Sequence, residues 1–202
     1  MTRTFDLDWL VLAYTLPPEP SRKRVAVWRR LRKLGAVYVN EGFWFLPNQA
    51  ELAQSLDDVV DEVYQFGGTA SAFVASDLRP EQHERLRERF TKARDEEYRE
   101  LRQECQRFKS HVGLEMKRGN FRFVEVEELE QDLEKRVRWL AEIVARDFFG
   151  STEREEIERL LHECRESLAS FTEAAYEQSN NAEGASTDAG AIALIEDAES
   201  AS

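Results

Sequence analysis

Cysteine and long apolar runs are the clearest shortages in this sequence of 202 residues. Only two cysteines occur, Cys105 and Cys164. Two are too few for a disulfide framework in a chain of this length, so a reducing cytoplasm is the expected location. No apolar run approaches the ~20 residues that a membrane-spanning helix requires, so no membrane partner is expected. The opening residues "MTRTFDLDW" also lack the apolar stretch and cleavage site of a signal peptide.

Motifs of common active sites are missing as well. The sequence has no glycine-rich phosphate loop, no nucleophile elbow and no evident pair of catalytic carboxylates. Cys105 and Cys164 fall on apolar helical faces and are expected to be small buried side chains. A redox or metal role would require the two thiols to meet in space with further ligands, and His111 and His162 lack the spacing for that. We therefore expect no enzyme, no cofactor and no metal.

Apolar and charged residues, by contrast, are plentiful. Hydrophobic residues make up 42% of the chain and include 12 Phe, enough to bury a core. Charged residues reach 34%, which favours long solvated helices, and the formal net charge is -12. Residues 180–202 hold five acidic residues and no basic one. This small-residue, acidic composition predicts a disordered tail over residues 180–202.

Residues 1–78 alternate between strand and helix patterns. The run "WLVLAYTL" is apolar throughout and ends at Pro17-Pro18, as is typical of a buried central strand. A turn is predicted at Asn40-Glu41-Gly42. The predicted elements are a strand over 9–16, a helix over 21–34, two strands within 36–46, a helix over 50–66 and a strand over 69–76. The order β-α-β-β-α-β predicts an α+β fold with a ferredoxin-like domain over residues 1–78.

Three amphipathic helical patterns follow from Pro80 onward. Apolar residues recur at spacings of three and four, with one wider gap at Arg94. These positions are Leu86, Phe90, Tyr98, Leu101, Cys105, Phe108 and Val112; then Val126, Leu129, Leu133, Val137, Leu140, Val144 and Phe148; then Ile157, Leu160, Leu161, Cys164, Leu168 and Phe171. Thr152 and Glu155 predict a capping box for the third helix. Three such helices joined by short links predict an antiparallel three-helix bundle over residues 79–179.

The first predicted helix is strongly basic. The stretch from Ser21 to Val39 contains seven basic residues and no acidic one. Val25, Val27, Trp28, Leu31 and Leu34 share its apolar face, and the candidate nucleic-acid-binding residues on the other side are Arg22, Lys23, Arg29, Arg30 and Lys33. Five cations within ~15 Å of helix attract a phosphate backbone and release its counterions. Ser21, as the predicted N-cap, leaves N–H groups at the helix start as a further anion site.

Two interpretations of this basic face stay open. The cations either bind an anionic partner, with nucleic acid favoured, or pair with the acidic helices of the same chain at 49–66 or 123–160. Phe43 and Trp44 are candidates for stacking on bases, although neighbouring strand residues face opposite ways, so at least one is expected in the core. Asp147 opposes the dipole at a predicted helix end, which suggests a tertiary partner such as an arginine.

Several segments together resemble the N-terminal domain of ChrB-type chromate-resistance proteins. They are "WLVLAYTLP", "RVAVWRRLRKLGAVYVNEGFWFLP", "GNFRFVEVEELEQDLEKRVRWLAEIVARDFFG" and "CRESLASF", within residues 9–172. That family comprises regulators of chromate efflux genes. The resemblance therefore implies DNA binding or sensing, with chromate or another oxyanion as a further ligand to be tested, and it favours the basic helix as the DNA contact.

The first domain is also similar to the small ferredoxin-like domain of phenylacetate-pathway repressors and CRISPR adaptation nucleases. In those nucleases an aspartate at the end of the first strand holds a metal. Here Thr15 lies near that place, no carboxylate occurs before Glu19, and Asp6 and Asp8 precede the strand. Because phosphodiester cleavage with Mg²⁺ requires carboxylate ligands, a nuclease is the less favoured reading.

The favoured expectation is a cytoplasmic, non-enzymatic transcription regulator that forms a homodimer and binds DNA. The alternative from a different class is a protein-interaction or dimerisation module without DNA binding, in which the basic helix docks an acidic partner.

Overall fold

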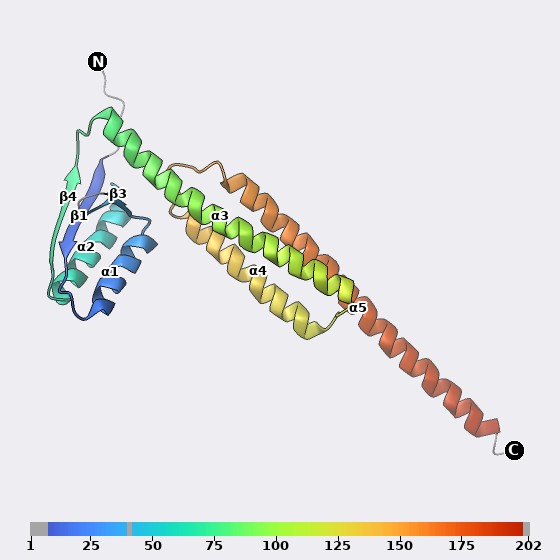
Figure 1. The fold of residues 1–202 in the computed structure, drawn as a ribbon. Helices are drawn as coiled ribbons and strands as arrows, with labels where there is room; N and C mark the ends of the chain where they lie inside the picture. Colours follow the sequence, from blue (N-terminus) through green and yellow to red (C-terminus); the bar gives the residue numbers. More distant parts are fainter. Residues whose placement is uncertain (1–7, 40–41, 200–202) are drawn as a thin grey trace. The chain divides into compact units, whose positions relative to one another are not determined.

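The computed structural model describes residues 8–39 and 42–199, with side chains to residue 181. It confirms the α+β class, with four strands and five helices among the described residues (Figure 1). In chain order the elements are β1 (Trp9–Thr15), α1 (Ser21–Lys33), β2 (Val37–Val39), β3 (Phe43–Pro47), α2 (Ala50–Gln65), β4 (Thr69–Ala75), α3 (Pro80–Arg118), α4 (Phe123–Val144) and α5 (Arg154–Glu199). In the predicted turn at 40–42, residues 40 and 41 lie outside the described part.

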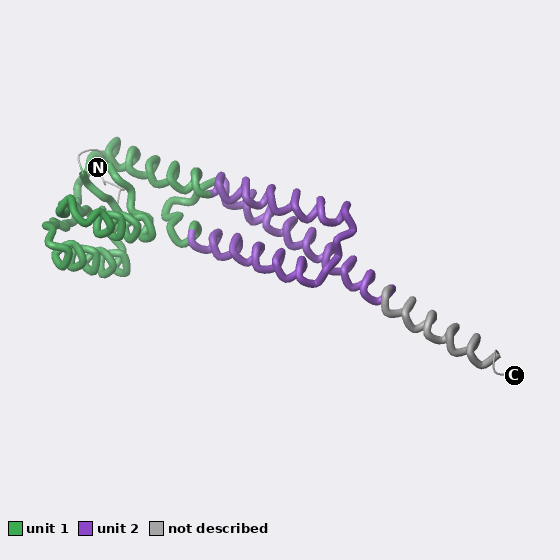
Figure 2. The backbone as a smooth tube through the Cα atoms, turned by 60° about the horizontal axis from the view of Figure 1, so that its bottom comes forward, with its two compact units in different colours: residues 1–97, 143–152 green, residues 98–142, 153–202 purple. Residues whose placement is uncertain are grey.

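The chain divides into two compact units (Figure 2). The first comprises residues 1–97 and 143–152, and the second comprises residues 98–142 and 153–202. The predicted boundary after residue 78 differs from this division, because the first turns of α3 pack on the sheet. Helix α5 continues to Glu199 and so includes most of residues 180–202, where the sequence predicts a disordered tail.

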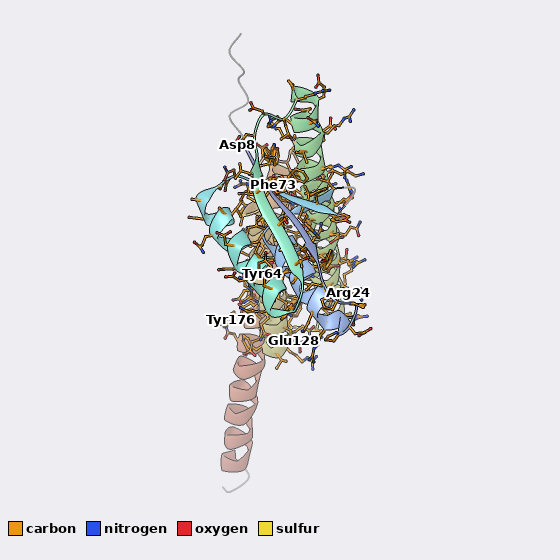
Figure 3. The ribbon with its side chains drawn as sticks, turned by 90° about the vertical axis from the view of Figure 1, so that its left-hand side faces the viewer. Asp8, Arg24, Tyr64, Phe73, Glu128 and Tyr176 are labelled. Atoms are coloured by element: carbon orange, nitrogen blue, oxygen red, sulfur yellow. The ribbon has the colours of Figure 1, made fainter. Side chains whose placement is uncertain are left out.

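The four strands form one antiparallel sheet in the order β2-β3-β1-β4. β1 lies between β3 and β4 and is buried on both faces, which explains its uninterrupted apolar sequence. Leu10 and Leu12 contribute to the core on one face, and Trp9 and Val11 to the core on the other. β4 forms one edge of the sheet and is seen in front in Figure 3, where Phe73 is labelled. β2 forms the opposite edge.

Helices α1 and α2 cover one face of the sheet (Figure 1). Val27 and Leu31 of α1 are fully buried there against residues such as Val59 of α2. The predicted apolar face of α1 is only partly correct, because Val25 is 42% and Trp28 50% exposed. Neither side chain belongs to the core that Val27 and Leu31 form over the sheet.

The other face of the sheet is covered by the first turns of α3. Leu86 and Phe90 pack there, and the Phe90 ring stacks on Trp9 with centroids 5.5 Å apart. The indole Nε1 of Trp9 donates to Nδ1 of His83 at 3.0 Å. The segment after α4 adds Phe148, which the sequence placed on the helix itself; α4 ends earlier, at Val144.

The second unit consists of segments of α3, α4 and α5 that lie side by side (Figures 1 and 2). The predicted apolar positions of α5 are buried as expected, and so are Val126, Leu129 and Leu133 in the first half of α4, but the second half of α4 differs. Ile143 is fully buried, whereas Val137 and Leu140 are half-buried. Arg136 takes an inward place instead: its guanidinium lies over the Phe108 ring, 5.1 Å from the centroid.

The start of α5 differs from its prediction. The helix begins at Arg154, and the N–H of Ile157 donates to the carbonyl of Glu153 at 3.2 Å. Among the described side chains, Thr152 and Glu155 make no hydrogen bond of the capping-box type. The predicted capping box is therefore wrong, because the helix starts one residue later than that motif requires.

Candidate nucleic-acid interface

The N-terminus of α1 is capped differently from the prediction. Pro20 is the N-cap residue and offers no side-chain hydrogen bond, and Ser21 is already inside the helix. The N–H of Ser21 donates to the carboxylate of Glu19 at 3.3 Å, and the N–H of Lys23 to the Pro20 carbonyl at 3.1 Å. The chain's own acceptors thus take N–H groups that the sequence analysis assigned to an external anion.

Two of the five predicted cations are held by the first unit itself. Arg30 forms ion pairs with Asp58 and Glu62 of α2, each at 3.2 Å. The ammonium of Lys23 lies 3.3 Å from the carbonyl oxygen of Phe66 and over its ring. These two side chains therefore face α2, and the interpretation of intramolecular pairing holds for them.

The other three predicted cations are Arg22, Arg29 and Lys33. All three are exposed, and none forms an ion pair or hydrogen bond with the described part of the chain. Their spacing of seven and four residues places them in one row on the outer side of α1, about 16 Å long. We call this set the outer row.

A second row of side chains follows the flank of α1, at spacings of four residues. It consists of Arg24, Trp28 and Arg32. The Arg32 guanidinium lies over the Trp28 ring, 6.0 Å from its centroid. Figure 3 labels Arg24 on α1 and Tyr64 on α2, at different sides of this helix pair. This flank therefore points away from α2.

One carboxylate holds the inner end of this flank in place. Glu97 accepts from Arg94 at 3.1 Å and from Arg146 at 2.9 Å, and it lies 4.0 Å from Arg32. Arg94 is only 1% exposed and fills the gap that the sequence analysis noticed in the apolar pattern. Its Nε and Nη1 have no hydrogen-bond partner among the described residues. Burial lowers the pKa of Arg94, against the opposing effect of Glu97.

Asp147 caps a turn, and its charge also opposes the lowering of the pKa of Arg94 by burial, in keeping with the predicted arginine partner. Both of its carboxylate oxygens accept from the Ser151 N–H, at 3.1 and 2.9 Å, so it caps the turn after α4. The neighbouring Arg146 pairs with Glu97 and donates to the carbonyl of Arg32 at 3.4 Å. The segment 143–152 is thereby tied to the end of α1.

The aromatic residues at this surface are not the predicted ones. Trp44 is 5% exposed and belongs to the core under α1, and Phe43 packs toward the opposite core. The exposed rings are Trp28, at 50%, and Tyr38, at 55%. The alternation of Tyr38 with two valines in a short strand is the sequence signal for its outward position.

The two cysteines meet in the second unit. Both are fully buried, and the Cys164 thiol donates to the carbonyl of Cys105 at 3.6 Å. A hydrogen bond with Cys164 and burial both raise the pKa of the Cys105 thiol, which keeps it neutral. In the part of the chain that the structure describes, no three His, Cys, Asp or Glu side chains gather as a metal site.

The fold and this surface define an α+β protein whose first helix presents a row of cations without ion pairs to the described residues, in a chain of formal net charge -12. Residues 24–182 match the family model described as Protein ChrB, N-terminal. The chain belongs to this family, which is associated with chromate resistance. No curated protein and no solved structure matches the chain. None of the described helices is both long and apolar enough to cross a bilayer.

Proposed function

We propose that this chain is a cytoplasmic, non-enzymatic regulator of chromate- or oxyanion-resistance genes that binds DNA through α1. The observation that carries the proposal is the outer row of Arg22, Arg29 and Lys33, which no carboxylate of the described residues neutralises. Family membership supports the role in chromate resistance.

The outer row suits a phosphate backbone rather than base recognition. Three cations along about 16 Å of helix reach successive phosphates and release counterions, which gives affinity with little sequence choice. In a chain of net charge -12, such binding has to be local and oriented. Arg30 and Lys23 add little, since their charges already have partners in the first unit.

We also infer the finer architecture that positions this row. Residues 1–78 form a ferredoxin-like domain and residues 79–179 an antiparallel three-helix bundle. The element order β1-α1-β2-β3-α2-β4 and the strand order β2-β3-β1-β4 support the first inference. The buried positions shared by α3, α4 and α5 support the second.

An exposed apolar cluster in the second unit favours a second candidate function, homodimerisation or another protein contact. Five large apolar side chains are between 38% and 61% exposed near the turn from α3 to α4: Leu114, Met116, Phe123, Val124 and Tyr176. Phe123 and Tyr176 touch, with ring centroids 5.1 Å apart. Exposed apolar side chains in contact, such as this pair, are typical of protein interfaces. A dimer would present two outer rows to one duplex.

The decisive test is a gel-shift titration with duplex DNA from upstream of the gene that encodes the chain. The variant Arg22→Glu/Arg29→Glu/Lys33→Glu should lose affinity by roughly a hundredfold or more, and the slope of log affinity against log salt should fall by up to about 3. The control Arg99→Glu/Lys117→Glu/Arg165→Glu changes the net charge equally at exposed cations of the second unit. Equal losses in both variants, or no shift with the unmutated chain, would contradict the proposal.

A further inference from the structure

The edge of the sheet at β2 carries a second basic surface that the outer row does not include. Two hollows of the first unit meet at Tyr38: one also contains Arg24 and Trp28, the other Arg32 and Lys92. We call their joint surface the β2-edge groove, defined by Trp28, Arg32, Tyr38, Arg85, Arg89 and Lys92.

The charge of the groove comes from two helices on either side of β2. Arg85, Arg89 and Lys92 follow one another on α3 at spacings of four and three residues, so they form a row. All three are exposed and make no ion pair within the described ranges. Glu88 and Glu96 also line the groove, but with Arg32 the cations outnumber them.

Arg32 is the cation that the fold fixes most firmly at this surface. It lies over the Trp28 ring and 4.0 Å from Glu97, whose charge Arg94 and Arg146 already share. The ion pair of Arg32 with Glu97 is longer than those of Arg94 and Arg146, and the Arg32 side chain is 42% exposed, so its charge is accessible from the groove. An anion bound there would be attracted by Arg32 together with the cations of α3.

Exposed aromatic rings lie next to these cations. Trp28 and Tyr38 are each at least half exposed, and Tyr38 is supported from below by Trp44, with centroids 5.3 Å apart. A supported, exposed ring beside a row of cations is the arrangement that binds single-stranded nucleic acid, because bases stack on the ring and phosphates meet the charges.

The structure also bears on the competing occupant, an acidic peptide that adds a strand to the sheet. β2 has only three residues, Val37–Val39, and pairs with β3 alone. Such a short edge offers few backbone hydrogen bonds to an added strand. We propose that the β2-edge groove binds a single-stranded nucleic acid, with a base on Trp28 or Tyr38 and phosphates on Arg32, Arg85, Arg89 and Lys92.

The test measures fluorescence anisotropy of the full chain with a labelled mixed-sequence single strand of about 12 nucleotides. Arg85→Glu/Arg89→Glu should weaken binding by roughly tenfold or more, and Arg85→Gln/Arg89→Gln by less. Trp28→Ala should lower the affinity for the single strand by roughly fivefold to a hundredfold, whereas Trp28→Phe, which keeps an aromatic ring, should retain most of the affinity. Arg99→Glu/Arg165→Glu is the control of equal charge and should bind as the unmutated chain does.

Three outcomes would overturn the inference. These are unchanged binding by Arg85→Glu/Arg89→Glu, an equal loss in the charge control, and equal binding of a polyglutamate peptide of the same net charge. The outer-row variant separates this inference from the proposed function, because Arg22→Glu/Arg29→Glu/Lys33→Glu should lose the promoter duplex and keep the single strand. If the unmutated chain binds only the single strand, the proposed function fails and the groove stands.

Discussion

Among single residues of the first unit, Glu97 is a mostly buried carboxylate surrounded by arginines. Its carboxylate contacts Arg94 and Arg146 and lies near Arg32, and its side chain is only 15% exposed. Removing one partner of a buried ion pair leaves the other charge buried and unpaired. The stability lost in this way exceeds the net stabilisation that the intact pair provides. The cluster therefore joins the end of α1, the middle of α3 and the segment after α4.

Removing this charge should destabilise the first unit. Glu97→Gln removes the carboxylate that pairs with Arg94 and Arg146, so the free energy of unfolding should fall by about 3 kcal/mol. Urea denaturation followed by circular dichroism measures the change. Glu96→Gln, at an exposed carboxylate without a described partner, is the control and should change little. A Glu97→Gln variant as stable as Glu96→Gln would show that the cluster has no structural role.

Gly35 offers a second test, since two separate constraints require a glycine there. Its φ is +81°, and an added Cβ would lie 3.0 Å from Cβ of Arg146. Gly67 has a similar φ of +79°, but no atom lies within 4 Å of its added Cβ. Gly67→Ala should therefore lower the free energy of unfolding by about 1 to 2 kcal/mol, because alanine disfavours the left-handed backbone conformation, and Gly35→Ala should lower it clearly more. Thermal unfolding of both variants checks this; equal losses would mean that the close approach of Arg146 is unimportant.

Among the elements, α1 and the α3–α4 connection show how neighbouring helices are held. On α1, the position around the helix decides whether a cation pairs with α2, as Arg30 does, or has no ion pair with a described residue, as with Arg29. At the α3–α4 connection, Glu115 is buried and accepts from Asn120 at 2.9 Å and from Arg118 at 2.8 Å. The Glu115 carboxylate thus links the last turn of α3 to the connection that follows.

The connection should make stability depend on pH. The Asn120 hydrogen bond, with help from Arg118, holds the pKa of Glu115 below its usual 4.5. A lowered pKa in the folded state stabilises the fold above pH 4.5, and this contribution is lost as the pH falls through the lowered value. Asn120→Ala should therefore reduce the free energy of unfolding at pH 7 more than at pH 3.

Urea denaturation across that range measures the difference. In the background of Glu115→Gln, Asn120→Ala should have an effect that no longer varies between pH 7 and pH 3. A pH-dependent effect that persists without the carboxylate would assign it to another group.

For the whole molecule, the distribution of charge matters more than its total. The chain has a formal net charge of -12, yet the outer row and the β2-edge groove both belong to the first unit, and both carry cations that form no ion pair with the residues the structure describes. The segment 180–202, with five acidic residues and no basic one, is a candidate anion that competes with DNA for these cations. Long-range attraction between unlike charges weakens as salt is added.

Deleting residues 180–202 should therefore tighten binding of the promoter duplex at low salt, and the gain should shrink as salt screens the charges. Gel-shift titrations at low and physiological salt measure this. Replacing the five acidic residues of the segment by their amides, without deletion, should have the same effect. Unchanged affinity in both variants would rule out competition by the segment.

Much of the fold was predictable, because periodicity reports burial on one face. The apolar run of β1, the order of the first six elements and the buried face of α5 all followed from local sequence. The errors fell at helix ends and on α4, where a long side chain such as Arg136 lies inward along an apolar ring. A prediction from the spacing of apolar residues treats arginine as polar and therefore does not place Arg136 inward.

The sequence predicts that a basic surface lies on α1, but it does not predict which residues form that surface. Charge density picked out α1, yet two of its five cations pair or bond within the first unit. The unpaired cations of α3 at the β2-edge groove were not predicted, because Arg85 and Arg32 lie far apart in sequence and meet only through the sheet. Trp28 was assigned to the core, since it falls at a helical spacing from Val25 and Leu31.

The class of fold, the family and the helix that carries the basic charge can be read from the sequence, since each depends on residues close together in the chain. The fold as a whole sets which cations lack a carboxylate among the described residues and which rings are exposed. The physical reason is that pairing and burial depend on neighbours from other elements, as with Glu97 of α3 beside Arg32 of α1. Local pattern holds no information on such distances.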